Sequence, residues 1–149
     1  MRVADIMTPD PACCTPDTTA QEAAALMRDN DCGSIPVVES DQRKRLIGIV
    51  TDRDLAVRGL AEGKGPDSRV GDLMTTAPIS AAAEDEVEIV REVMISRLVR
   101  RVPVIDLNGD LVGIVAQADI AREDGAASDQ EVGRIVEAIS EPTRGDLEE

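Results

Sequence analysis

The sequence predicts an α/β (α+β) fold in which two β-α-β-β-α repeats pack with approximate two-fold symmetry into one compact domain. Three observations lead to this prediction. Long segments of the chain occur twice, each copy shows the same order of strand-like and helix-like segments, and an amphipathic stretch without a counterpart follows the second copy. The last observation adds a C-terminal helix to the expected fold.

The internal repeat is visible in three separate blocks. "VADIMTPDP" returns as "VGDLMTTAP" and "SIPVV" as "RVPVI", each 67 positions later, and "LIGIV" returns as "LVGIV" after 65 positions. Agreement in three blocks makes a chance similarity a poor explanation. We therefore divide the chain into a first repeat (1–62), a Gly- and Pro-containing linker (63–69), a second repeat (70–123), and a C-terminal helix with an acidic tail (124–149).

Each copy predicts the same elements in the same order. A short extended piece (12–14 and 79–81) precedes a helix. In the first copy this helix has Thr18 or Thr19 as its N-cap, and in the second copy it has Val87, Val90 and Met94 on one face. Two strands joined by a hairpin follow, and a closing helix begins near Thr51 or Ala116. A unit of this size cannot bury both faces of its sheet alone, so we expect the copies to pack together.

The stretch 128–140 has capping-box spacing and an apolar stripe at helical period. We expect this helix to dock either on its own domain or on a partner subunit.

Composition excludes several classes of function. The 149 residues carry a net charge of −14 and contain no Phe, Tyr or Trp, so the chain lacks both a basic footprint and aromatic stacking platforms for nucleic acid. No run of apolar residues is long enough to span a membrane, and the N-terminus has no apolar signal region. Three cysteines are too few for a disulfide framework. We expect a soluble, cytoplasmic protein with no nucleic-acid or membrane partner.

The doubled opening "DIMT…P" or "DLMT…P", the "PV" strand and the "GIVTDRD" turn resemble a pair of CBS (cystathionine β-synthase) motifs over residues 1–123. The chain is similar to small stand-alone bacterial CBS-pair proteins, including the hypoxic-response type. This resemblance implies a Bateman module that forms a homodimer and binds AMP, ADP, ATP, NAD or S-adenosylmethionine in clefts between the motifs. It also implies a regulatory role, in stress response for example, and an unknown protein target contacted in trans.

Two interpretations of "TDRD" share one geometry. In the first, Thr51 and Asp54 cap the helix that follows the strand, since their spacing is that of a capping box. In the second, they bind a nucleotide, with the carboxylate accepting ribose hydroxyls and the threonine near ribose or phosphate, as the family resemblance implies. The interpretations are compatible. The second copy keeps the carboxylate as Asp119 but has Ala116 in place of the threonine.

Basic residues differ between the copies as well. Related modules place cations where Arg100 and Arg101 stand, facing the partner motif's cleft, so we expect them to serve the site of Thr51 and Asp54. The alternative is a solvated strand end or a partner contact. The mirror-related site has Gly33 and Ser34 at this position, and we therefore predict one competent and one degraded site.

Backbone groups around the two strand prolines complete the predicted site. Those of Ile35, before Pro36, and of Val102 are expected at the adenine edges, and residues 12–14, including Cys13, are expected to line the cavity.

Other functions are predicted more weakly. The chain has no His, no nucleophile-base pair and no phosphate-binding glycine loop, so we expect no enzyme and no required cofactor. Cys14 and Cys32 align with Ala81 and Val99, which favours small buried apolar side chains over ligands, and no metal site is predicted. The alternatives to a nucleotide sensor are a structural dimerisation module without a physiological nucleotide and a redox- or metal-responsive protein that uses Cys13, Cys14 and Cys32.

Overall fold

The computed structural model describes residues 1–123, which form two compact units. One unit consists of residues 12–78, and we call it the 12–78 unit. The other joins residues 1–11 to the chain from residue 79 onward, and we call it the 79–123 unit. The helix predicted over 128–140 and the acidic tail lie outside the described residues.

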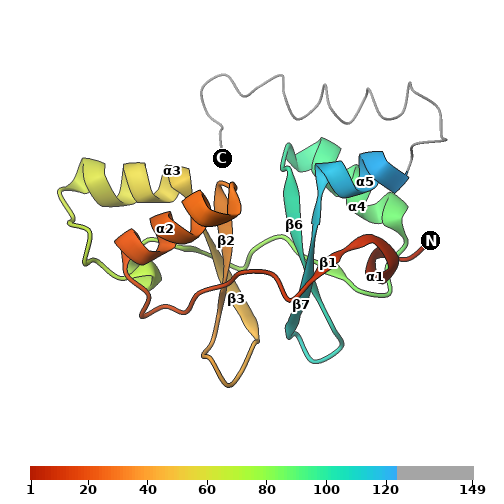
Figure 1. Cartoon of the computed structure of the whole chain (residues 1–149), viewed down its shortest axis with the longest axis horizontal. Helices are drawn as coiled ribbons and strands as arrows, with labels where there is room; N and C mark the ends of the chain where they lie inside the picture. The colour runs from red at the N-terminus through yellow and green to blue at the C-terminus, as the bar shows by residue number, and fades with distance from the viewer. Residues whose placement is uncertain (124–149) are drawn as a thin grey trace. The chain divides into compact units, whose positions relative to one another are not determined.

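The 12–78 unit packs one helix and a further helical stretch on a three-stranded antiparallel sheet of order β2-β3-β4 (Figure 1). Its elements in chain order are α2 (Ala20–Asn30), β2 (Ser34–Val38), β3 (Leu46–Thr51), α3 (Asp52–Asp54), the π-helical η1 (Leu55–Gly59), the 3-10 helices η2 (Leu60–Glu62) and η3 (Val70–Asp72), and β4 (Thr75–Thr76). Between β2 and α2 lies a core of Cys14, Ala23, Met27, Ile35, Val37, Val50 and Val70.

Helix α2 begins at a full capping box, which settles the choice between the two candidate threonines. The Thr19 hydroxyl oxygen accepts from the Glu22 amide at 3.1 Å, and the Glu22 carboxylate accepts from the Thr19 amide at 2.9 Å. The amides of Ala20 and Gln21 donate to carbonyls of Ser68 and Pro66 in the predicted linker. The linker therefore satisfies two of the N–H groups that every helix start leaves unpaired.

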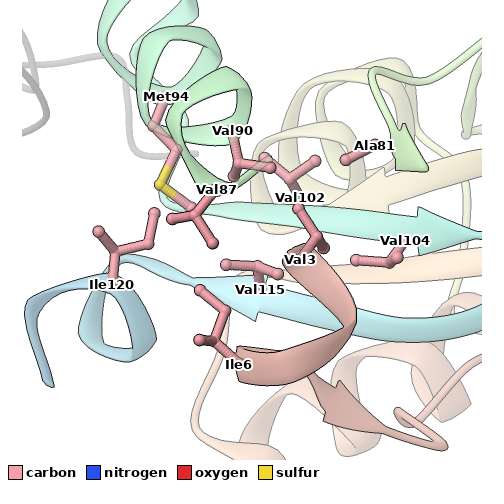
Figure 2. Packing of buried hydrophobic residues seen from close by; sticks show 10 residues of the cluster. All are labelled: Val3, Ile6, Ala81, Val87, Val90, Met94, Val102, Val104, Val115 and Ile120. Atoms are coloured by element: carbon pink, nitrogen blue, oxygen red, sulfur yellow. The ribbon is translucent and has the colours of Figure 1, made fainter. Parts of the chain in front are cut away.

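The 79–123 unit repeats this plan with a four-stranded sheet of order β1-β7-β6-β5, in which only the β5–β6 pair is parallel. Its elements are α1 (Val3–Ile6), β1 (Thr8–Pro9), β5 (Ala81–Ala82), α4 (Val87–Arg97), β6 (Arg101–Ile105), β7 (Leu111–Ala116) and α5 (Gln117–Glu123). Val87, Val90 and Met94 project from one face of α4 onto the sheet, as the sequence predicts, and meet Ile120 of α5 (Figure 2).

The opening segments of the two repeats are exchanged between the units. β1 pairs with β7 of the second repeat, with Thr8 opposite Ile114, whereas β4 of the second repeat pairs with β3, with Thr76 opposite Gly48. Val3 and Ile6 are accordingly buried in the core of the 79–123 unit (Figure 2). The spatial units therefore divide the chain at points other than those where the sequence repeats.

The glycine of each "GIV" strand makes this exchange possible. A Cβ on Gly48 would lie 2.9 Å from the Thr75 carbonyl oxygen, and one on Gly113 would lie 3.0 Å from the Thr8 carbonyl oxygen. Side-chain carbons almost never approach backbone that closely, so only glycine allows the short edge strand to pair here. The "MT" segment of one repeat and the "GIV" of the other are thus complementary.

The mixed α/β fold with two repeated units is confirmed. Both predicted hairpins and all four predicted helices within residues 1–123 are present, although the closing helix of the first repeat continues beyond α3 as π and 3-10 turns. The symmetrical packing of the two units against each other stays a prediction.

The swapped pairing of the two opening segments predicts which unit a mutation in each segment destabilises. Ile6→Ala should weaken the 79–123 unit by about 2–4 kcal/mol, because it removes a buried side chain and leaves a cavity. Native-state amide exchange should then accelerate in β7 and α4. The matched change at the equivalent position, Leu73→Ala, should accelerate exchange in β2 and β3 instead. Faster amide hydrogen exchange in β2 and β3 with Ile6→Ala would contradict the swapped pairing of the opening segments.

Candidate functional site

The turn from β3 into α3 is closed by a reciprocal pair of hydrogen bonds. The Thr51 hydroxyl oxygen accepts from the Asp54 amide at 3.0 Å, and Oδ2 of Asp54 accepts from the Thr51 amide at 3.0 Å. Asp54 is buried, with 8% of its surface exposed. The capping interpretation of Thr51 and Asp54 is therefore confirmed, and Oδ1 is the carboxylate oxygen that this cap does not use.

The second copy retains half of the cap. Oδ2 of Asp119 accepts from the Ala116 amide at 2.8 Å, as in the first copy, and Asp119 is equally buried. Ala116 has no hydroxyl, so the reverse hydrogen bond cannot form. The carboxylate at this position therefore has the same structural duty in both copies, and the threonine adds a second bond to the first copy only.

An arginine one turn along the helix stands near each carboxylate. In the first copy, Nε of Arg58 lies 3.8 Å from Oδ1 of Asp54, beyond hydrogen-bond distance. In the second copy, Nη2 of Arg122 donates to Oδ1 of Asp119 at 2.6 Å. Sequence reasoning missed both arginines. Their spacing from the aspartates, four and three residues, is that of helical side-chain neighbours and could have identified them.

The residue before each "PV" strand accepts a hydrogen bond from the start of the closing helix. The Gly33 carbonyl accepts from the Asp52 amide at 2.9 Å, and the Arg100 carbonyl accepts from the Gln117 amide at 2.8 Å. In the adjoining strand pair, Arg101 lies opposite Ala116. Arg100 and Arg101 are thus placed beside the helix start of their own repeat, with Arg100 exposed and Arg101 half-buried.

The two strand residues proposed at the adenine edge have buried side chains. Ile35 and Val102 are each 1% exposed and pair with Val50 and Val115 in their sheets. Only their backbone could reach a ligand, which is the role that the sequence analysis gave them. The Pro36 carbonyl accepts from the Cys14 amide at 3.0 Å, so residues 12–14 run alongside β2.

The predicted site residues therefore fall into two sets. Each set lies within one unit: Cys13, Ile35, Pro36, Thr51 and Asp54 belong to the 12–78 unit, and Arg100, Arg101, Val102 and Asp119 belong to the 79–123 unit. The joining of members of both sets in one site stays a prediction.

The three cysteines have different surroundings. Cys14 is 5% exposed within the core of its unit, where Ala81 stands in the other unit. Cys32 packs partly buried against the same core, and its thiol donates to the Ser34 carbonyl at 3.4 Å. Cys13 is half-buried, and Nζ of Lys44 lies 3.8 Å from its sulfur. The prediction that Cys14 is a small buried apolar side chain is confirmed.

The pKa of the Cys14 thiol is raised from 9.0 to about 12, mainly by burial and to a smaller extent by the neighbouring Cys13, while a hydrogen bond with Thr18 opposes the rise. Within residues 1–123, no three Cys, Asp or Glu side chains are grouped so that they could hold a metal ion. No helix in this part of the chain is long and apolar enough to cross a membrane.

The cap geometry predicts the stability of the first-copy turn. Thr51→Ala should lower the free energy of unfolding by about 1 kcal/mol, because the Asp54 amide loses its acceptor, whereas Thr51→Ser keeps the hydroxyl and most of the stability. Chemical denaturation without ligand measures the difference. Equal loss in Thr51→Ala and Thr51→Ser would show that the hydroxyl does not cap the helix.

The raised pKa of Cys14 predicts the pH dependence of stability. In the folded protein the thiol keeps its proton up to about pH 12, whereas in the unfolded chain it is released near pH 9. The unfolded state therefore binds fewer protons between these values, and the free energy of unfolding falls as pH rises through this window. Cys14→Ala, which copies the second repeat, should show a smaller fall between pH 9 and 11 in denaturation experiments. Identical slopes for the two proteins would contradict the raised pKa.

Comparison with known proteins identifies the family. The CBS domain matches residues 3–59 and again residues 70–125. Hypoxic response protein 1 of Mycobacterium tuberculosis is 37% identical over 139 residues, which cover 93% of each chain. The crystal structure of Hypoxic Response Protein I with two coordinated zinc ions has a TM-score of 0.73 at 38% identity, and covers 82% of this chain and 98% of that one.

Two further solved structures contain adenosine compounds. CBSX2 of Arabidopsis thaliana in complex with AMP has a TM-score of 0.73 at 29% identity, with 84% of this chain and 96% of that chain covered. The CBS domain pair of protein MJ0100 in complex with 5′-methylthioadenosine and S-adenosyl-L-methionine has a TM-score of 0.72 at 28% identity, with 86% and 98% covered. Because the family match spans both repeats and the relatives align over nearly their full length, this chain belongs to the CBS domain family as a CBS-domain pair.

Proposed function

We propose that this CBS-domain pair is a non-catalytic regulatory module that binds an adenosine compound and acts on a protein partner in trans. The observation that carries the proposal is the presence of AMP, S-adenosylmethionine or 5′-methylthioadenosine in similar CBS pairs at 28–29% identity. Every one of these compounds contains adenosine, so a ribose and an adenine ring are the groups that the site must recognise.

The strand-to-helix turn of the first repeat supplies groups suited to a ribose. Oδ1 of Asp54 is outside the cap and can accept a ribose hydroxyl, as acidic residues do in other nucleotide sites. The Thr51 oxygen accepts from the Asp54 amide, so its own O–H remains able to donate to a ligand oxygen. Capping and ligand binding thus use different atoms of the same two side chains.

A phosphate-bearing ligand also needs positive charge, because the chain has a net charge of −14. We propose that Arg100 and Arg101 provide it. Arg101 stands at the start of β6 and is half-buried, whereas Arg100 is exposed. The backbone of Ile35, Pro36 and Val102 and the segment around Cys13 are proposed to contact the adenine.

We also propose that this protein forms a homodimer and contacts its protein partner in trans. Helical turns η1 and η2 leave Val57 and Leu60 exposed by 46% and 76%, and we propose that they contribute to a contact with another protein surface. A module of this kind transmits ligand binding only if the bound and empty forms differ in their affinity for the partner.

Thermal denaturation with AMP, ADP, ATP, NAD or S-adenosylmethionine tests ligand binding. A ligand that binds the folded state stabilises it by RT ln(1 + [L]/Kd), so at least one compound should raise the melting temperature in a concentration-dependent way. A chelator and a thiol reductant are added in parallel to detect metal- or redox-dependent stability. No shift at millimolar concentrations of all five compounds would refute the proposed sensor.

The substitution Asp54→Asn tests whether the ligand binds at the strand-to-helix turn of the first copy. The amide keeps one oxygen for the cap but replaces the other acceptor with a donor, so affinity for the bound compound should fall about 10- to 100-fold with little change in stability. Asp119→Asn is the matched control and should change affinity less than threefold. A larger effect of Asp119→Asn than of Asp54→Asn would assign the ligand to the second copy.

A further inference from the structure

The two capping aspartates have different neighbours at the oxygen that a ligand would use. Oδ1 of Asp119 accepts a charge-assisted hydrogen bond from Arg122 at 2.6 Å, whereas Oδ1 of Asp54 has its nearest guanidinium nitrogen, Nε of Arg58, at 3.8 Å. We propose that Arg122 occupies the Asp119 carboxylate and thereby confines ligand binding to the Asp54 turn. This inference rests on the proposed function and names a residue that determines which copy binds.

Arg58 is held back from Asp54 by two backbone carbonyls. Its Nη1 donates to the Met74 carbonyl at 2.9 Å and to the Leu73 carbonyl at 3.3 Å. Both carbonyls belong to the segment that leads into β4, so the guanidinium is hydrogen-bonded to the sheet edge and makes only a long ion pair with the carboxylate. Asp54 therefore keeps a nearby positive charge while its Oδ1 makes no hydrogen bond to Arg58.

Arg122 follows its aspartate by three residues, whereas Arg58 follows by four. When the two repeats are aligned at the 65-residue offset of their "GIV" strands, Arg122 aligns with Val57, and Glu123 aligns with Arg58. The first-copy helix is π-helical from Leu55 to Gly59, whereas α5 is α-helical from Gln117 to Glu123. The arginine three residues after its aspartate, Arg122, thus hydrogen-bonds the carboxylate, whereas the arginine four residues after its aspartate, Arg58, is held by backbone carbonyls.

The consequence for a ligand at the second copy is chemical. One oxygen of Asp119 is engaged by the Ala116 amide and the other by Arg122, so a ribose hydroxyl must displace a charge-assisted hydrogen bond before it can bind. The Arg122 side chain is 66% exposed, which screens the pair and keeps the displacement cost moderate. Removing Arg122 should therefore increase affinity at Asp119 by about 2- to 5-fold.

Calorimetric titration with AMP and S-adenosylmethionine tests the inference in a background without the first site. Asp54→Asn/Arg122→Gln should bind about 2- to 5-fold more tightly than Asp54→Asn alone, and adding Asp119→Asn should abolish the gain. Asp54→Asn/Arg97→Gln is the matched control, because it removes an exposed arginine from α4 of the same unit with the same change in net charge. Melting temperatures verify that each variant folds. If Arg122→Gln fails this test, Arg122→Met, which keeps the aliphatic stem, takes its place.

Asp54→Asn/Ala116→Thr separates the masked carboxylate from the missing hydroxyl. A gain with Arg122→Gln but not with Ala116→Thr supports the inference. The inference is overturned by the absence of a gain with Arg122→Gln, by an equal gain with Arg97→Gln, or by a gain that survives Asp119→Asn. In each of these cases the proposed function still stands if the unmutated chain binds the compound in an Asp54-dependent way. Absence of binding by every protein refutes the proposed function, and the inference fails with it.

Discussion

The buried carboxylate at the strand-to-helix turn is the group on which the candidate site depends. It must satisfy the backbone amide at the end of the preceding strand, since an unpaired amide there would cost about 1–3 kcal/mol. This duty fixes the carboxylate's position to within hydrogen-bond geometry in both copies. A ligand that uses the remaining oxygen meets a group already held in place, which lowers the ordering cost of binding.

The two copies show how a shared structural duty allows binding capacity to diverge. The cap at Asp119 persists without the threonine, because the carboxylate alone satisfies the Ala116 amide. The fold therefore places little demand on the residue before α5 or on the arginine that follows. At Asp54, in contrast, the same turn carries a hydroxyl, a carboxylate with an uncapped oxygen and an arginine tied to neighbouring carbonyls. Such divergence is expected wherever stability needs only part of a site.

The sequence could predict whatever depends on local pattern. Apolar periodicity located α4 with Val87, Val90 and Met94 on its buried face, and capping spacing located the start of α2 to within one residue. The exchange of opening segments could not be predicted, because both "MT" segments have the same pattern and either sheet could accept either one. Nor could the partners of Arg58 and Arg122, since the carbonyls that bind Arg58 lie 15 and 16 residues away in the chain, beyond the reach of any local pattern. The joining of residues from both units in one site depends on a placement that neither sequence nor single-unit geometry supplies.

The exchanged opening segments also bear on how the chain folds as it is synthesised. Residues 12–78 contain all three strands of their sheet, so this unit can close soon after Thr76 has left the ribosome. Residues 1–11 emerge before the 12–78 unit, yet their strand partner, around Ile114, is made after that unit. Val3 and Ile6 therefore stay without their native core while the intervening chain is translated, and the pairing of β1 with β7 closes a long loop at a late stage. Residues 1–11 are thus made before the 12–78 unit but find their native partners only in chain that is made after it.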